Sequence, residues 1–203
     1  KIRIKNFGPI RQGCPDDDGW IDIKKVSVFI GNQGSGKSCV AKLISTFTWI
    51  EKALVRGDYA ISDFSAVKFR KTYCGYHRIA NYFFNNAHSD AAEIEYEGEA
   101  YSMKYQKGDF QISEKQSRKY FLPQIMYVPA ERNFISIIKE AKSFKSLPDS
   151  LLEYITEFNN AKDEIKDGLS LPINDAEIKY DKQHDVINVT GNDYQVGDRK
   201  SVV

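Results

Sequence analysis

A short run near the N-terminal end combines glycines, a lysine and a hydroxyl side chain in the pattern G-x-x-x-x-G-K-[ST] of a phosphate-binding loop. The run reads Gly31, Asn32, Gln33, Gly34, Ser35, Gly36, Lys37 and Ser38. Glycines let the backbone wrap closely around an anion with its amide N–H groups pointing inward. Lys37 would reach the β- and γ-phosphates, and Ser38 would offer its hydroxyl to a bridging Mg²⁺. We therefore expect residues 31–38, together with Cys39, to bind a nucleotide.

The segments on either side of this loop have the patterns of the strand and the helix that flank a phosphate-binding loop. Residues 26–30 form a β-branched, apolar run, which predicts a buried strand. Apolar residues then recur at helical spacing, which predicts a helix over residues 37–55. That helix would present its positive N-terminus to the same phosphate. The alternative is a glycine turn before a helix with no ligand, but strand, loop, Lys-Ser and helix together favour the phosphate site.

The rest of the chain predicts further strands and helices. Alternating or compact apolar runs predict strands at residues 1–5, 20–23, 93–97, 101–105, 110–112, 124–128, 176–180 and 185–190. The three from 93 to 112 form an antiparallel meander, and the last two form a hairpin. Helical patterns predict helices at residues 78–86, 134–142 and 150–166, the last with Ser150 as its N-cap.

Composition limits the class of protein. The chain has 203 residues, 41% of them hydrophobic, and a net charge of +1. These values exclude a disordered tail, a collagen-like fibre and a disulfide scaffold, and they remove bulk charge as an argument for nucleic-acid binding. The sequence contains no apolar run of the roughly 18–20 residues that a membrane span needs, and no signal sequence. Three irregularly spaced cysteines favour reduced thiols and a cytoplasmic protein. Because the sequence has no apolar span, no membrane partner is expected.

The opening Asn6-Phe7-Gly8-Pro9-Ile10, followed by the glycine-rich run, resembles the N-terminal half of an ABC-type ATPase. The branch it resembles is the SMC, RecF and OLD-like group, often described as AAA-family ATPases. The resemblance is strongest over residues 1–55 and extends to residues 127–133. It implies an α/β P-loop NTPase fold with a mixed sheet, an antiparallel β-meander and part of a helical lobe. Residues 1–203 would then be one partial ATPase domain, with sections at 1–55, 56–128 and 129–203.

Residues 127–133 resemble the strand and Q-loop of such ATPases, in which a glutamine contacts Mg²⁺ and the attacking water. Ala130 stands at the glutamine position, so the chain departs from the pattern. The neighbouring Glu131 could substitute, which makes it, with Lys37, a candidate catalytic residue and, with Ser38, a candidate Mg²⁺ ligand. Arg132 could contact phosphate. The alternative is a strand end with solvated charges. A Walker B strand is disfavoured because Pro129 and Ala130 separate the apolar run from the first acidic residue.

Other parts expected from the resemblance are absent from the sequence. The chain contains no Leu-Ser-Gly-Gly-Gln-like signature and no apolar strand ending in Asp-Glu. It therefore looks like a nucleotide-binding half whose catalytic half is missing, so this chain alone would lack the catalytic carboxylate. The resemblance implies Mg²⁺-dependent ATP hydrolysis by the full-length protein, ATP-dependent homodimerisation, and action on DNA or an effector protein. The alternative is a nucleotide-binding sensor with little hydrolysis.

Two smaller groups of residues complete the candidates. A basic and aromatic cluster could contact DNA, although a solvated face is the preferred interpretation. It comprises Arg56, Lys68, Arg70, Lys71, Tyr73, Tyr76 and Arg78. His77, His88 and His184 are expected on the surface, in polar surroundings. The acidic run at residues 16–18 is expected to be a solvated loop, not a metal site.

Overall fold

The computed structural model describes residues 1–84, 91–116, 120–131, 147–165, 169–171, 177–181, 186–190 and 195–196. The protein is mixed α/β, with helices and antiparallel sheets. It divides into two compact units. The first comprises Lys1–Arg132 and Phe144–Leu151, and the second comprises Asn133–Ser143 and Leu152–Val203.

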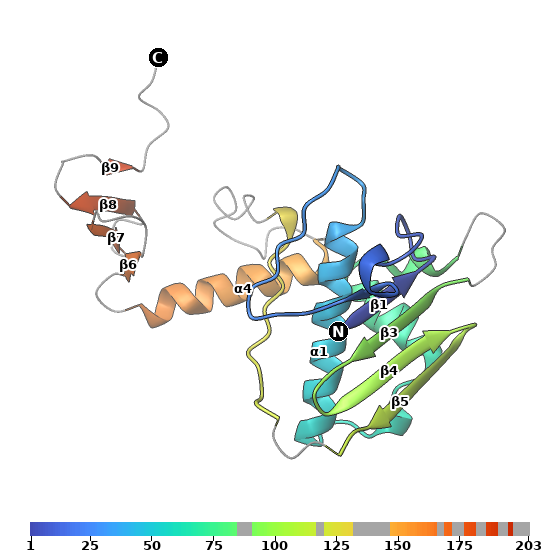
Figure 1. Ribbon diagram of the computed structural model, residues 1–203. Helices are drawn as coiled ribbons and strands as arrows, with labels where there is room; N and C mark the ends of the chain where they lie inside the picture. Colours follow the sequence, from blue (N-terminus) through green and yellow to red (C-terminus); the bar gives the residue numbers. More distant parts are fainter. Residues whose placement is uncertain are drawn as a thin grey trace. The chain divides into compact units, whose positions relative to one another are not determined.

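The first unit is built on a five-stranded antiparallel sheet with the order β2-β1-β3-β4-β5 (Figure 1). Its strands are β1 (Ile2–Lys5), β2 (Trp20–Ile21), β3 (Glu93–Glu97), β4 (Tyr101–Gln106) and β5 (Asp109–Glu114). The strands expected near residues 1–5 and 20–23 and the meander are therefore confirmed. Lys107 and Gly108 connect β4 to β5 with positive φ angles of 50° and 75°, which suit a tight hairpin turn.

Helix α1 (Lys37–Arg56) covers the inner face of this sheet, as its hydrophobic spacing predicts. Strand alternation directs Ile2, Ile4 and their cross-strand partners inward, where they meet the apolar stripe of the helix. Phe47 of α1 stacks on Tyr96 of β3 with 5.1 Å between ring centroids. The helix ends at Gly57, whose left-handed conformation (φ 74°) caps its last turn.

Several short helices also belong to the first unit. They are η1 (Pro15–Asp17), η2 (Ile61–Asp63), α2 (Ala66–Lys68), the π-helical η3 (Phe69–Tyr73), α3 (Cys74–Tyr76) and η4 (Ala80–Phe83). Of the helix expected over residues 78–86, the described part contains only η4, and residues 85–86 lie outside the described residues. Phe69 is fully buried and stacks on Phe110 of β5 at 4.3 Å, so η3 contributes directly to the core.

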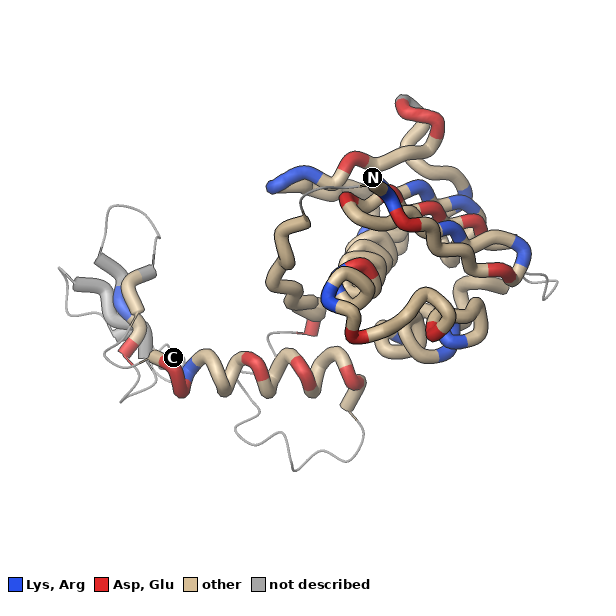
Figure 2. The backbone as a smooth tube through the Cα atoms, turned by 90° about the horizontal axis from the view of Figure 1, so that it is seen from below, with Lys and Arg blue, Asp and Glu red and all other residues tan. Residues whose placement is uncertain are grey.

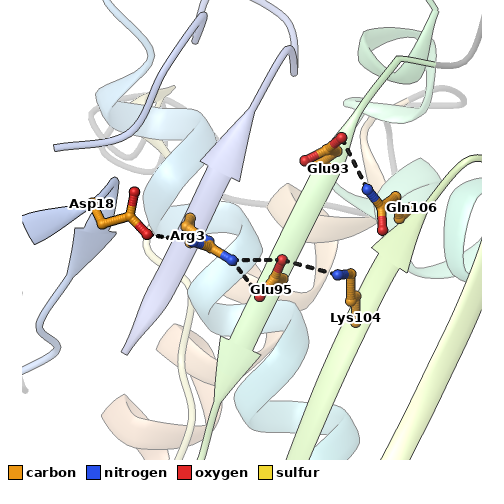
Figure 3. Close-up of polar contacts among 6 residues, drawn as sticks. All are labelled: Arg3, Asp18, Glu93, Glu95, Lys104 and Gln106. Atoms are coloured by element: carbon orange, nitrogen blue, oxygen red, sulfur yellow. Dashed lines mark hydrogen bonds and ion pairs between the residues drawn. The ribbon is translucent and has the colours of Figure 1, made fainter. Parts of the chain in front are cut away.

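The outer face of the sheet carries a row of cross-strand ion pairs centred on Arg3 (Figure 3). The guanidinium donates to both carboxylate oxygens of Glu95 at 2.9 Å and to Asp18 at 3.0 Å. It also lies 4.9 Å from the ring centre of Trp20, and Lys104 adds a second cation 3.3 Å from Glu95. Partial burial alone would raise the pKa of Glu95, but the hydrogen bonds from Arg3 and Lys104 lower it. This row links β2, β1, β3 and β4.

Helix α4 (Asp149–Glu164) and a four-stranded antiparallel sheet follow in the chain. The sheet has the order β6 (Leu169–Leu171), β7 (Glu177–Asp181), β8 (Val186–Thr190) and β9 (Gln195–Val196). The expected hairpin is confirmed as β7 and β8, whereas β6 and β9 were not predicted. Because α4 begins at Asp149, Ser150 lies inside its first turn and is not the N-cap. The helix expected at residues 134–142 lies outside the described residues.

Two predicted strands are wrong. Residues 26–30 and 124–128 are irregular, and both sheets in the described part of the chain are antiparallel, so the expected mixed sheet is not formed there. Val26 and Val28 are each 76% exposed and Ile30 is 92% exposed, where burial was expected. An apolar run becomes a strand only where a neighbouring strand accepts and donates its backbone hydrogen bonds, and no described strand pairs with these two segments.

A buried carboxylate fixes the far end of α1 to the sheet. Glu51 is only 2% exposed and accepts hydrogen bonds from the Tyr96 hydroxyl (3.0 Å) and from the backbone N–H groups of Ala100 (2.7 Å) and Tyr101 (3.0 Å). The turn between β3 and β4 wraps so closely around this carboxylate that a Cβ on Gly98 would lie 2.2 Å from an oxygen. The helix and the turn therefore hold each other in register.

We expect Glu51→Ala to lower the free energy of unfolding by about 2–4 kcal/mol, because it leaves buried N–H and O–H donors without an acceptor. Urea unfolding followed by circular dichroism measures the change. Lys52→Ala, at the next position of the same helix, is the control and should cost less than about 1 kcal/mol. Equal stability of the Glu51→Ala variant and the wild type would contradict this assignment.

Candidate functional site

The glycine-rich loop, defined as residues 31–38, leads directly into the first turn of α1. Gly34 and Gly36 have φ angles of 79° and 96°, in the left-handed region that favours glycine. The backbone turns at each of these two glycines and so reaches Lys37, where α1 begins. The first turn of the helix contains no acidic residue, and no side chain caps it. Its amide N–H groups are therefore available to an anion.

The backbone of Gly36 lies in close contact with side chains of the N-terminal segment. A Cβ on Gly36 would lie 2.6 Å from Ile10 Cγ1 and 3.4 Å from Pro9 Cγ, so only glycine fits without displacing that segment. Ile10 and Phe7 in turn exchange backbone hydrogen bonds of 2.9 Å that close the turn after β1. The Asn-Phe-Gly-Pro-Ile opening and the loop, separate in sequence, therefore form one contiguous structure.

The Lys37 side chain folds back across the loop. Its ammonium donates to the carbonyl oxygens of Gly31 and Asn32, both at 2.7 Å, and to Ser35 Oγ at 3.4 Å. These contacts hold the one cation of the loop close to its backbone. A phosphate oxygen placed there would offer the ammonium a charged acceptor in place of neutral carbonyls, which is the stronger interaction.

Residues 31–39, which are expected to bind the nucleotide, form the loop and the first turn of α1. Exposed residues of the loop are Gly31, Asn32, Gln33, Gly34, Ser35 and Ser38. Lys37 is half-buried and Gly36 is buried. Cys39, at 7% exposure, faces the core, and burial raises the pKa of its thiol. We infer that Cys39 could contribute its backbone N–H to an anion, but that its thiol is not a reactive group.

The run of residues 120–131 lies alongside α1 and leads towards the N-terminal end of that helix (Figure 1). Within it, half-buried Ile125 and Tyr127 alternate with exposed Met126 and Val128. Burial, and then the nearby charges of Glu131 and Cys39, raise the pKa of Tyr127. Tyr127 therefore lies close to both the first turn of α1 and Glu131.

The end of this run contains the second predicted site. Pro129 is buried, whereas Ala130 and Glu131 are exposed. The carboxylate of Glu131 is thus open to solvent, as a metal or water ligand would need to be. Its charge acts on Tyr127, which is also close to Cys39 in the first turn of α1, but no hydrogen bond joins Glu131 to the loop among the described residues. Arg132 lies outside the described residues.

His77 is buried, so the expectation that it lies on the surface is wrong. It is 4% exposed, and its Nδ1 has no hydrogen-bond partner among the described residues. The expectation rested on its neighbours in the sequence, whereas the rings of Tyr76 and Tyr127 pack against the imidazole in the fold. His88 and His184 lie outside the described residues.

Three members of the basic and aromatic cluster, Arg70, Tyr73 and Tyr76, are half-buried, and the other four are exposed. Tyr73 packs between Trp49 and Phe64, with ring centroids 5.4 Å and 5.5 Å away, and Arg70 donates to the Tyr105 hydroxyl at 3.3 Å. Basic and acidic positions are interspersed along the strands of the first sheet (Figure 2). Arg56, Lys68, Lys71 and Arg78 are exposed, in agreement with the expected solvated face, and contact with DNA stays a prediction.

Comparisons with protein families, curated proteins and solved structures found no match to this chain. Within the described residues, no group of three or more His, Cys, Asp or Glu side chains is arranged to hold a metal ion. None of the helices in that part of the chain is long and apolar enough to cross a lipid bilayer. The functional argument therefore depends on the loop and its surroundings.

The buried state of His77 predicts a pH dependence of stability. Burial, followed by the positive charge of Lys42, lowers the pKa of His77 to about 4, from about 6.5 in an unfolded chain. Between these values the unfolded chain binds a proton and the native protein does not, so stability falls as the pH falls through this window. We expect His77 to account for a loss of about 1–3 kcal/mol between about pH 7 and pH 4.

Urea unfolding of the wild type and of His77→Phe at both pH values tests this expectation, because the other titrating groups cancel in the comparison. The variant should lose less stability on acidification than the wild type. The same loss in both proteins would show that His77 is already protonated or exposed in the native state.

Proposed function

We propose that this chain binds ATP with Mg²⁺ through the glycine-rich loop, and that the full-length protein hydrolyses it to ADP and phosphate. The observation that carries the proposal is the continuous arrangement of two left-handed glycines, Lys37 and the uncapped first turn of α1. A glycine turn that only connected two elements would not need a lysine folded over its carbonyls.

The available groups suit a nucleotide phosphate chain. Backbone N–H groups of the loop and of the first turn of α1 would hold the phosphate oxygens. Lys37 would move from its carbonyl acceptors to the β- and γ-phosphates, and exposed Ser38 would be one ligand of Mg²⁺. Mg²⁺ bridging the phosphates would neutralise the charge that develops during transfer. Glu131 would orient either that ion or the attacking water.

We also propose a P-loop NTPase fold of the ABC type for the complete ATPase domain. The glycine-rich loop followed directly by α1, and the packing of the Asn-Phe-Gly-Pro-Ile opening against Gly36, support this proposal. ATP-dependent dimerisation of the full-length protein, and action on DNA or on an effector protein, are parts of the same proposal that depend on the resemblance alone.

The second candidate function is a nucleotide-binding sensor with slow hydrolysis. Ala130 at the position of the expected glutamine favours it, because alanine has no group to orient water. The two functions share the same binding site, and they differ in whether Glu131 replaces the missing amide. Binding must therefore be tested separately from hydrolysis.

We expect calorimetry to detect ATP binding to this chain in the presence of Mg²⁺, and Lys37→Ala to weaken it by at least about tenfold, or about 1.4 kcal/mol. The loss of a charge-assisted contact to phosphate is the reason. Lys25→Ala is the matched control, since Lys25 is an exposed lysine before the loop, and its affinity should stay close to that of the wild type.

Circular dichroism should confirm that Lys37→Ala remains folded, because that residue also holds the loop. Two results would contradict nucleotide binding by the loop. One is equal affinity for ATP in the Lys37→Ala variant and the wild type, and the other is no binding of ATP to the folded wild type.

A further inference from the structure

The run of residues 120–131 is held in place without a strand ladder. None of its described residues belongs to a sheet, and no backbone hydrogen bond anchors it in the described part of the chain. Yet Tyr127 in this run lies close to both Cys39 in the first turn of α1 and the exposed Glu131. Side-chain packing must therefore determine where the run lies, and hence where Glu131 lies.

Besides the burial of Pro129, the structure provides a contact between Tyr127 and His77. The imidazole meets the Tyr127 ring edge to face, with 4.7 Å between centroids and 71° between planes. On its other side it meets Tyr76 at 4.8 Å, also edge to face. The imidazole of His77 is thus packed by aromatic rings, and such pairs contribute about 0.5–1.5 kcal/mol each beyond buried area.

His77 is itself fixed to the helix that begins at the loop. Lys42 of α1 donates from its ammonium to the His77 carbonyl oxygen at 2.9 Å. The backbone after α3 is also closed by hydrogen bonds from Arg78 N–H to Gly75 O (2.8 Å) and from Ile79 N–H to Cys74 O (3.0 Å). His77 therefore has little freedom to move relative to the first half of α1.

We propose that His77 is a positioning residue: it joins α1 to the run of residues 120–131 and so holds Glu131 at the phosphate site. Its backbone is anchored to α1 through Lys42, and its ring is anchored to the run through Tyr127. The role of Glu131 at Mg²⁺ rests on the proposed function, but the mechanical link between His77 and the run does not. The part of nucleotide affinity that depends on Mg²⁺ would require this link, whereas contacts of the loop and Lys37 with phosphate would not.

The first measurement addresses the link itself and requires no nucleotide. Nitroxide labels at Ala130→Cys in the run and Val55→Cys on α1, in a Cys14→Ser background, report the distance between the two segments by pulsed electron paramagnetic resonance. Ala130 and Val55 are exposed, and the remaining Cys39 and Cys74 are buried. We expect a narrow distance distribution that is lost in His77→Ala and retained in His77→Phe, which keeps a ring against Tyr127.

Two variants keep this measurement interpretable. Tyr127→Ala removes the other side of the contact without altering the His77 backbone, so it should broaden the distribution even if His77→Ala does not fold. Phe64→Ala removes a buried ring that contacts Tyr59 and Tyr73 elsewhere in the unit, and it should leave the distribution narrow. A narrow distribution in both His77→Ala and Tyr127→Ala would overturn the proposal.

The second measurement tests the consequence for Mg²⁺. The ratio of ATP affinities with and without Mg²⁺ should fall about tenfold in His77→Ala and to the same extent in Glu131→Gln, with the metal-free affinity unchanged in both. His77→Phe should restore the ratio. A ratio that falls in Glu131→Gln but not in His77→Ala would overturn the proposal. If no variant binds ATP, the proposed function fails, and the distance measurement alone decides whether His77 positions the run.

Discussion

The burial of one face of α1 against the antiparallel sheet is the constraint on which the first unit depends. The helix contributes Leu43, Phe47 and Ile50 to the core, and none of these side chains is exposed. Each such side chain contributes about 1.5–3 kcal/mol through removal of apolar surface from water. The same helix begins at Lys37, directly after the glycine-rich loop, so core packing also determines where the groups proposed to bind phosphate lie.

Both ends of α1 are positioned by contacts that tolerate little change. At its start, Gly36 lies against Ile10 too closely for any side chain. At the far end, Glu51 accepts three hydrogen bonds from β3 and from the residues that begin β4. A helix held at both ends cannot slide along the sheet, so the orientation of its first turn is set before any ligand binds. This is the preorganisation that anion binding by backbone N–H groups requires.

The sequence predicted the elements whose stability is local or whose partners are near in the chain. The spacing of apolar residues predicted α1, and the turn residues around Gly98 and Gly108 predicted the meander, because each pattern contains its own periodicity and its own turns. It also predicted the loop, whose residues are contiguous. It could not predict the contact between Gly36 and Ile10, since nothing in either residue type reveals which part of the chain approaches it.

The remaining errors have physical causes of the same kind. Residues 26–30 have the composition of a buried strand, but composition does not supply the neighbouring strand that makes it one. His77 was expected on the surface from its neighbours in the sequence, which do not reveal that Tyr127, far along the chain, packs against its ring. Ser150 has the right residue type for an N-cap, but α4 begins one residue earlier.

Phosphate binding and hydrolysis, which a phosphate-binding motif suggests together, place different demands on this structure. Phosphate binding needs only the loop, Lys37 and the start of α1, and these are assembled within residues 1–56 by the sheet and its helix. Hydrolysis would also need groups placed around the γ-phosphate, and the one proposed, Glu131, lies on a run that forms no strand in the described structure. The position of a carboxylate on such a run depends on the side chains that anchor the run. The proposed phosphate site can therefore be fully formed while the position of Glu131 still depends on how firmly residues 120–131 are held.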